Sequence, residues 1–207
     1  MSKKRVNGAS ARRSQRNVCV YCGSGLGLNP AYRAAARTLG AAFAANDIGL
    51  VYGGGNVGLM GVIADAAIAA GGEVIGVIPQ SLKDREIAHT GVRDLRVVDS
   101  MHTRKAMMAD LSDAFIAMPG GVGTFEEIFE AITWTQLGVH RKPCGFLNVA
   151  GFYAPLIAFI DQAVSEGFIK PLHRAMIAVD DNPERLLDTL ATMPLPDVPK
   201  WIRKDET

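Results

Sequence analysis

Short apolar runs alternate with longer Ala-rich or amphipathic stretches, and this alternation constrains the fold more than any other feature of the chain. Continuous apolar strands separated by helices are typical of a parallel sheet covered on both faces. With right-handed crossovers, the pattern predicts an α/β fold, a single doubly wound Rossmann-like domain with a mainly parallel sheet. The predicted strands are Asn17–Cys22, Ile48–Tyr52, Glu73–Ile78, Leu95–Asp99, Ala114–Met118, Cys144–Asn148 and Met176–Val179. The predicted helices are Pro30–Asn46, Val57–Ala70, Met101–Leu111, Thr124–Leu137, Phe152–Glu166 and Pro183–Thr192.

The length of 207 residues and the absence of a dividing linker predict one folded domain. We expect this domain to span residues 17–192, between a disordered basic arm at 1–16 and a Pro-spaced tail at 193–207. Two of its helices have a clear start signal, because Pro30 and Pro183 each follow an Asn. Proline is favoured at the first helical position behind an Asn cap.

The charge distribution limits which partners are possible. The first sixteen residues hold six Lys or Arg and no acid, which leaves 16 basic and 21 acidic side chains in the rest of the chain. An acidic body is a poor surface for duplex DNA, because affinity depends on neutralising phosphates. We therefore expect no nucleic-acid partner. For the basic arm two interpretations remain, a solvated terminus and a segment that contacts nucleic acid. No secretory signal or membrane span is visible, so we predict a soluble, cytoplasmic protein.

The cysteines form neither a disulfide framework nor a metal site in this interpretation. Cys19 and Cys22 make a C-x-x-C within one apolar run, and positions three apart in a strand point to opposite faces. Cys144 has no companion, and no second C-x-x-C or H-E-x-x-H motif accompanies it. We therefore expect three core cysteines and no bound metal.

Glycine-rich segments follow the first two predicted strands, where ligands bind in folds of this type. The first is CGSGLG at 22–27 and the second is YGGGNVG at 52–58. Gly53-x-Gly55-x-x-Gly58 matches the dinucleotide fingerprint, but the next strand ends in IGVIPQ, without the acid that would hold a ribose. Contact with a phosphate or nucleoside therefore fits this segment better, and an NAD(P) oxidoreductase remains an alternative.

The segment MHTRKAMM opens a helix after the fourth strand and places Arg104 and Lys105 in its first turn. Cations near a helix N-terminus oppose the helix dipole, so stability does not explain their position. A bound anion would explain it. The competing interpretation is an exposed pair that extends into solvent.

The segment PGGVGTFEE, residues 119–127, follows the strand ending AFIAM and carries the strongest signal. Its glycines predict a tight loop feeding into a helix, and consecutive amides at a helix N-terminus form a phosphate cradle. No Lys follows the last glycine, so this is not a Walker loop. Thr124 and Glu127 have the spacing of a capping box. The alternative is that Glu127 acts on a sugar beside the phosphate; Glu126 points elsewhere on the helix.

Taken together, MHTRKAMM and PGGVGTFEEIFEAITW resemble the Lonely Guy (LOG) family of cytokinin-activating phosphoribohydrolases, often mislabelled lysine decarboxylases. The resemblance runs from about Asn17 to Leu190 and includes the full P-G-G-x-G-T-x-x-E pattern. It implies that Arg104 and Glu127 are the catalytic pair and that Gly121–Thr124 hold a 5′-phosphate. The substrate-binding residues that we assign on this basis are Ser24, Gly54, Gly55, Glu86, Met101, Lys105, Gly120, Gly121, Val122, Gly123, Thr124, Glu126 and Thr133.

The reaction implied by the resemblance is hydrolysis of the N-glycosidic bond of adenosine 5′-monophosphate or its N6-prenylated form. An anionic carboxylate suits an oxocarbenium-like sugar, and a fixed guanidinium suits charge developing on a departing base. No cofactor is expected, since pyridoxal phosphate needs a Schiff-base lysine in a supporting context that we do not find. The resemblance also implies a homodimer whose interface lies near the helix that carries Ile128, Ala131, Ile132 and Trp134. A non-catalytic carrier of a nucleotide or phosphorylated cofactor remains an alternative.

Overall fold

The computed structural model describes residues 16–85 and 88–196. Its strands are β1 Arg16–Tyr21, β2 Ile48–Tyr52, β3 Val74–Pro79, β4 Asp94–Val98, β5 Ala114–Ala117, β6 Cys144–Leu147 and β7 Ile177–Asp180. Its α-helices are α1 Pro30–Ala45, α2 Gly58–Ala69, α3 Gln80–Lys83, α4 Met101–Leu111, α5 Val122–Gln136, α6 Ala154–Ser165, α7 Pro171–Arg174 and α8 Pro183–Thr192. A short 3-10 helix, η1, spans Val149–Gly151.

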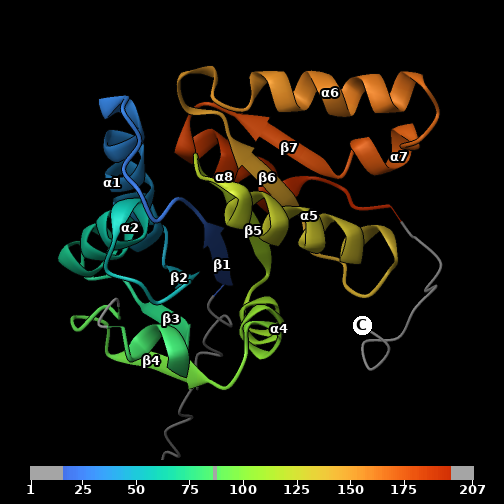
Figure 1. The fold of residues 1–207 in the computed structure, drawn as a ribbon. Coiled ribbons are helices and arrows are strands. Elements are labelled where there is room, and N and C mark those ends of the chain that lie inside the picture. Colours follow the sequence, from blue (N-terminus) through green and yellow to red (C-terminus); the bar gives the residue numbers. More distant parts are fainter. Residues whose placement is uncertain (1–15, 86–87, 197–207) are drawn as a thin grey trace, which may run out of the picture.

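The seven strands form one sheet in the order β4-β3-β2-β1-β5-β6-β7, and every neighbouring pair is parallel. Figure 1 shows the sheet running from β4 in green to β7 in orange-red. The chain builds outward from β1 to β4 and then returns to β5 on the other side of β1. This reversal is the topological switch point of a doubly wound fold, where ligands bind beyond the strand ends. The predicted α/β fold is confirmed.

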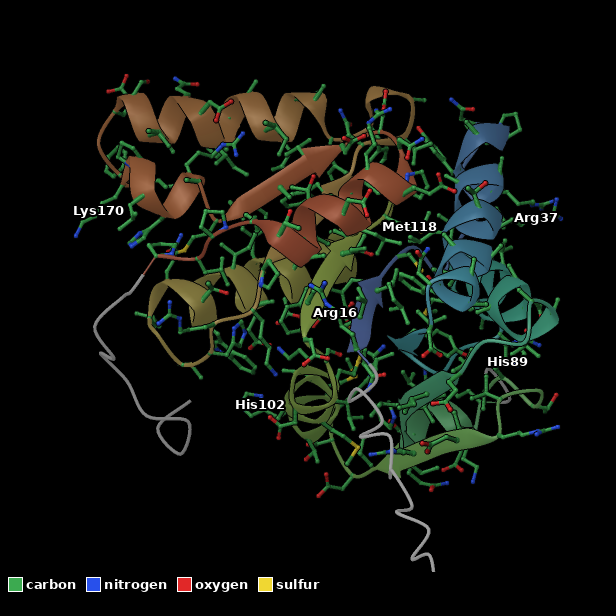
Figure 2. The ribbon with its side chains drawn as sticks, turned by 180° about the vertical axis from the view of Figure 1, so that it is seen from behind. Arg16, Arg37, His89, His102, Met118 and Lys170 are labelled. Carbon is green, nitrogen blue, oxygen red and sulfur yellow. The ribbon has the colours of Figure 1, made fainter. Side chains whose placement is uncertain are left out.

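The sheet separates two hydrophobic cores. One core contains buried residues of α1, α2 and α8, and the other contains buried residues of α4 and α5 together with Tyr153. Seen from behind in Figure 2, α8 lies in front of the sheet. Cys22 belongs to the first core and Cys19 to the second, as expected for strand positions three apart. All three cysteines are buried and free, so their predicted core role is confirmed.

Two predicted helix starts are confirmed by their caps. The Asn29 side chain accepts a hydrogen bond from Ala31 N at 3.0 Å, and Pro30 follows as the first helical residue. The Asn182 side chain accepts one from Arg185 N at 3.0 Å at the start of α8. Each cap satisfies one amide that the first turn of a helix leaves without a partner.

The start of α5 differs from the prediction in a way that matters for the site. The helix begins at Val122, two residues before the expected Thr124, because Gly121 is extended (φ −103°, ψ −158°) and forms the N-cap. Thr124 is therefore inside the helix, and the capping-box interpretation of Thr124 and Glu127 is wrong. The short helices α3, α7 and η1 were not predicted, because three or four residues carry no helical periodicity.

The described residues begin inside the predicted arm and end inside the predicted tail. β1 begins at Arg16, the last residue of the predicted arm. The rest of that arm and residues 197–207 of the predicted tail lie outside the described residues. None of the helices in the described part of the chain is long and apolar enough to cross a membrane.

Candidate active site

The loops that follow β1 and β5 meet at the switch point. Gly23 N donates a hydrogen bond to Pro119 O at 3.1 Å. A Cβ on Gly120 would lie 2.9 Å from Gly23 N and 2.2 Å from the Thr124 hydroxyl, so only glycine fits between these groups. A pocket of about 280 Å³ opens beside the junction; it is lined by Gly23, Ser24, Gly25, Leu26, Gly27, Tyr32, Leu59, Pro119, Gly120, Gly121 and Phe152.

The N-terminus of α5 opens next to this pocket. Its N-cap, Gly121, has no side chain to bond the first amides, and Gly121, Val122 and Gly123 are exposed. Apart from the adjacent residues and the backbone of α5, no atom of the described chain would lie within 4 Å of a Cβ added to Gly121 or Gly123. Uncapped amides at the positive end of a helix dipole attract anions. This end of α5 is where the sequence predicts a phosphate to bind.

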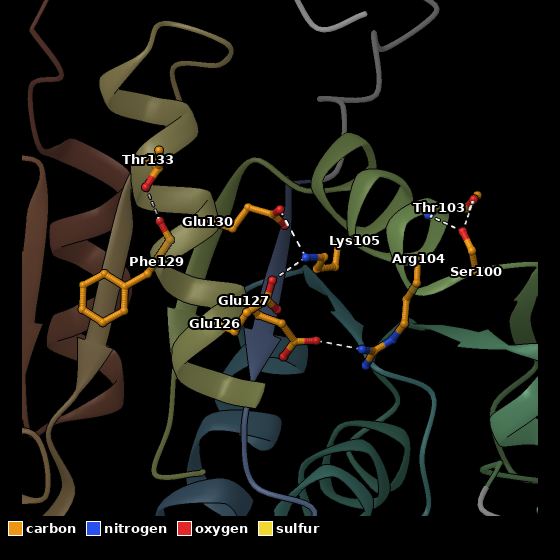
Figure 3. A network of polar contacts seen from close by, with 9 residues as sticks. All are labelled: Ser100, Thr103, Arg104, Lys105, Glu126, Glu127, Phe129, Glu130 and Thr133. Atoms are coloured by element: carbon orange, nitrogen blue, oxygen red, sulfur yellow. Dashed lines mark hydrogen bonds and ion pairs between the residues drawn. The ribbon is translucent and has the colours of Figure 1, made fainter. Parts of the chain in front are cut away.

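Arg104 of α4 and Glu127 of α5 form a buried ion pair at the carboxyl end of the sheet. Arg104 Nη1 donates to Glu127 Oε1 at 2.7 Å, and the two residues are 7% and 9% exposed. Arg104 Nε donates to Val77 O, the carbonyl of a β3 residue, at 3.1 Å. Figure 3 shows the guanidinium reaching from α4 toward the carboxylate on α5. The two predicted catalytic residues are thus brought together and held by separate elements.

The environment of Glu127 changes its acidity. Burial raises the pKa of Glu127 above its ordinary value of 4.5, and the neighbouring Arg104 charge opposes that rise. The negative charge of Glu126 adds a smaller upward shift to the pKa of Glu127. Little water screens this pair, so the attraction between the Glu127 carboxylate and the Arg104 guanidinium is stronger than it would be at the surface.

Lys105 joins the same two helices through a second set of charges. Its ammonium contacts Glu126 and lies 3.2 Å from Glu130 Oε1, and its side chain is only 12% exposed. The interpretation of Arg104 and Lys105 as an exposed pair is therefore wrong. Carboxylates of α5 compensate both cations, which explains why α4 tolerates them in its first turn.

The segment after β2, residues 53–57, forms a wall of the site and is called the β2 loop below. A Cβ on Gly53 would lie 2.1 Å from Arg104 Nη2, so glycine makes room for the guanidinium. Gly58 begins α2 with φ +57°, and its added Cβ would lie 2.2 Å from the Ser24 carbonyl carbon. Leu59 N already donates to Gly23 O at 3.0 Å. Gly53 and Gly58, two of the three fingerprint glycines, therefore face the protein itself, which argues against a pyrophosphate at this helix.

The remaining predicted substrate contacts belong to several different elements. Ser24 is exposed beside the pocket, and Met101 begins α4 with 46% exposure. Gly54 and Gly55 are buried in the β2 loop. Glu86 lies outside the described residues. Thr133 is exposed near the far end of α5, where its hydroxyl donates to Phe129 O, and Figure 3 shows it away from Arg104.

Several residues near the site carried no sequence signal. Tyr32 and Phe152 line the pocket with their rings 5.6 Å apart in an edge-to-face arrangement. The buried Tyr153 hydroxyl donates to Met118 O at 2.6 Å, just before the loop that contains Gly120. His89 contacts the β2 loop through its backbone amide. These contacts join residues far apart in the sequence, so no local motif could have revealed them.

The comparisons with known proteins add an independent line of evidence. A family profile described as possible lysine decarboxylase matches residues 60–190. A rice protein named probable cytokinin riboside 5′-monophosphate phosphoribohydrolase LOGL2 is 53% identical over 84% of this chain and 72% of its own length. The chain belongs to the LOG family. The Arabidopsis thaliana member LOG7, named a cytokinin riboside 5′-monophosphate phosphoribohydrolase, is 50% identical over 84% of this chain and 81% of its own length.

Solved structures place this LOG-family chain in a broader group of similar folds. The molybdenum cofactor binding protein of Rippkaea orientalis superposes with a TM-score of 0.66, covering 86% of this chain and 98% of that chain. Its sequence is only 24% identical, so the likeness shows a shared fold and nothing about shared ligands. Within the described residues of this chain, no group of three or more His, Cys, Asp or Glu is placed to hold a metal ion.

Proposed function

We propose that this protein hydrolyses the N-glycosidic bond of cytokinin riboside 5′-monophosphates, releasing the free base and ribose 5-phosphate. The observation that carries the proposal is the buried Arg104–Glu127 pair beside the uncapped N-terminus of α5. The names of relatives about half identical in sequence support the same reaction over a carrier role. The family profile's decarboxylase label has no counterpart in the site, where Lys105 is held by two carboxylates.

In the proposed reaction the residues have separate tasks. The 5′-phosphate binds the amides at Gly121–Thr124, which anchors the nucleotide and contributes remote binding energy to positioning the sugar. As the bond between C1′ and the base breaks, the Glu127 carboxylate stabilises the oxocarbenium-like sugar and activates a water molecule. The water oxygen bonds to C1′, and its proton balances the charge on the departing base.

Arg104 acts on the other side of the same step. Its guanidinium is held by Glu127 and the Val77 carbonyl, so its position is fixed before substrate arrives. A preorganised cation stabilises charge that develops on the departing base at little cost in reorganisation. Arg104 also favours the ionised form of Glu127, which burial alone would disfavour. The pair therefore favours an ionised carboxylate in a buried position.

The test is release of base from AMP and from isopentenyladenosine monophosphate, followed by chromatography. Glu127→Gln keeps the shape of the side chain and removes its charge, so we expect about 10³-fold slower release with the monophosphate still bound. Adenosine, which lacks the phosphate, should be a poor substrate. Glu166→Gln, which alters an exposed carboxylate at the end of α6, should behave as wild type.

Two results would separate the proposal from its alternatives. If the wild-type protein binds both monophosphates but releases no base, the hydrolase proposal fails and a carrier role replaces it. If release occurs, the acidic limb of kcat/KM should lie above pH 4.5, because the active carboxylate is lost as pH falls through the raised pKa of Glu127. The faster of the two substrates identifies whether a prenylated or a plain adenine is preferred.

We also propose that the protein is a cytoplasmic homodimer. The structure revises the sequence argument, because Ile128, Ala131 and Ile132 are buried in the chain's own core and only Trp134 among the four is partly accessible. Trp134 and Val139 line a hollow of about 310 Å³ between α4 and α5, and this is the surface at which we place the partner subunit. Light scattering that gives the mass of one chain would refute the dimer.

The proposed cytoplasmic location is supported by the free cysteines, which fit a reducing compartment, and cell fractionation tests it.

A further inference from the structure

His89 is a buried polar residue that the proposed reaction does not use. It is 5% exposed, and both nitrogens of its ring have partners. Gly91 N donates to Nδ1 at 3.1 Å, so Nδ1 carries no proton and the neutral ring is protonated at Nε2. Nε2 lies 3.1 Å from Asp65 Oδ1 and donates to it. Asp65 belongs to α2 and its side chain is 71% exposed.

The backbone around His89 is paired with the β2 loop. His89 N donates to Gly54 O at 2.9 Å, and Ala88 forms an antiparallel bridge with Gly55. The His89 ring therefore links residues 88–89 to α2, while the backbone of the same two residues is paired with the β2 loop. Figure 2 labels His89 beside α2, at the side of the molecule where β4 ends the sheet.

The β2 loop in turn limits where Arg104 can lie. A Cβ added to Gly53 would lie 2.1 Å from Arg104 Nη2. A Cβ added to Gly54 would lie 3.0 Å from the Ile78 Cβ, so Gly54 packs closely against that side chain. Gly53 and Gly54 are neighbours in one tight segment, and Gly54 has φ +72°. A shift of the Gly54 carbonyl would therefore displace the wall against which the guanidinium rests.

We propose that His89 is a positioning residue, which holds the β2 loop against Arg104 through its hydrogen bond to Asp65. This role rests on the proposed hydrolysis, because it acts through the guanidinium that stabilises base departure. A small displacement of a reacting group is enough to lower a catalytic rate strongly. The phosphate cradle belongs to α5 and does not contact His89, so the effect falls on kcat and leaves KM nearly unchanged.

The experiment uses Asp65 because its exposed side chain can be changed without opening the core. Asp65→Ala removes the acceptor, and we expect kcat for monophosphate hydrolysis to fall about tenfold with KM within about threefold of wild type. Asp65→Asn keeps an oxygen acceptor for Nε2 and should restore kcat to within about threefold. Asp188→Ala, which changes an exposed carboxylate on α8, serves as the matched control. His89→Ala should reproduce Asp65→Ala.

Hydrogen exchange of the His89 amide gives a readout that does not depend on activity. We expect Asp65→Ala to speed its exchange about tenfold, because the bond to Gly54 O opens more often. Faster exchange with unchanged kcat would make His89 a structural residue only and overturn the proposal, as would unchanged exchange. If wild-type protein releases no base, the proposed function fails first and the positioning role falls with it. The two failures are therefore distinguishable.

Discussion

The β2 loop and the segment 118–123, which runs from the end of β5 into α5, are both rich in glycine, but only the second has glycines without close neighbours. Gly120 packs against Thr124 and Gly23, as the glycines around the β2 loop pack against other groups, whereas Gly121 and Gly123 do not. At Gly53 and at Gly58, which follows the β2 loop, an added Cβ would collide with Arg104 or with the Ser24 backbone. At Gly121 and Gly123, at the start of α5, an added Cβ would meet no atom of the described chain beyond the adjacent residues and the backbone of α5. The first set makes room for the protein's own groups, and the second leaves room for something else.

The difference shows why a glycine motif alone is weak evidence for a ligand. Gly53-x-Gly55-x-x-Gly58 has the dinucleotide spacing, yet Gly58 serves the packing of α2 on the loop after β1. The Pro119–Thr124 segment lacks a standard fingerprint, yet it leaves backbone amides accessible at a helix N-terminus. What a glycine is for depends on its neighbours in space, and these come from distant parts of the chain.

Gly53→Ala should have the largest effect of the changes that distinguish the two loops. The new methyl group would displace a guanidinium that Glu127 and Val77 O hold from other directions. We expect kcat to fall about 100-fold, since a misplacement near 1 Å can cost that much. Steady-state kinetics measure the loss, and the circular dichroism spectrum checks the fold. A nearly wild-type kcat would mean that the β2 loop does not position Arg104.

The sequence predicts the strands and most of the helices that carry these two loops. Apolar runs locate all seven strands, and the Asn-Pro pairs locate the starts of α1 and α8, because these signals are local. The strand ends then predict which loops meet at the switch point. The predicted start of α5 is two residues too late, because a glycine N-cap has no side chain that would mark it in the sequence.

The site is less predictable than the fold for a physical reason. Arg104 and Glu127 are separated by 23 residues, and only a resemblance to a known family links them before the structure does. The role of Gly53 depends on Arg104, and that of His89 depends on Asp65 and Gly54. Such contacts arise when helices and loops pack, so neither periodicity nor local motifs encode them.

Gly121→Ala tests the glycines at the start of α5. Its effect should be smaller than that of Gly53→Ala and should fall on KM. Its backbone angles are accessible to alanine, and beyond the adjacent residues its methyl group would meet no atom of the described chain, so stability should hold. The methyl group would instead obstruct close approach of a phosphate to the amides. We expect KM to rise about tenfold, about 1.4 kcal/mol of binding, with kcat little changed. An equal fall in kcat with unchanged KM would contradict an anchoring role.

The smallest effects compare two buried tyrosines at the bases of these loops. Tyr153 donates to Met118 O at 2.6 Å before the loop after β5, whereas the Tyr52 hydroxyl, directly before the β2 loop, is buried without a hydrogen-bond partner in the described chain. Tyr153→Phe leaves a buried carbonyl without this donor and should lower the free energy of unfolding by about 1–2 kcal/mol. Tyr52→Phe removes an unsatisfied group and should leave stability unchanged or slightly higher.

Urea unfolding followed by tryptophan fluorescence measures both changes at once. Since the two substitutions delete the same atom from equally buried rings, the difference between them isolates the hydrogen bond to Met118. Equal midpoints for the two variants would show that this bond contributes nothing net to the stability of the loop after β5. A loss in Tyr52→Phe alone would mean that its hydroxyl has a partner, such as a bound water, that helps to fix the β2 loop.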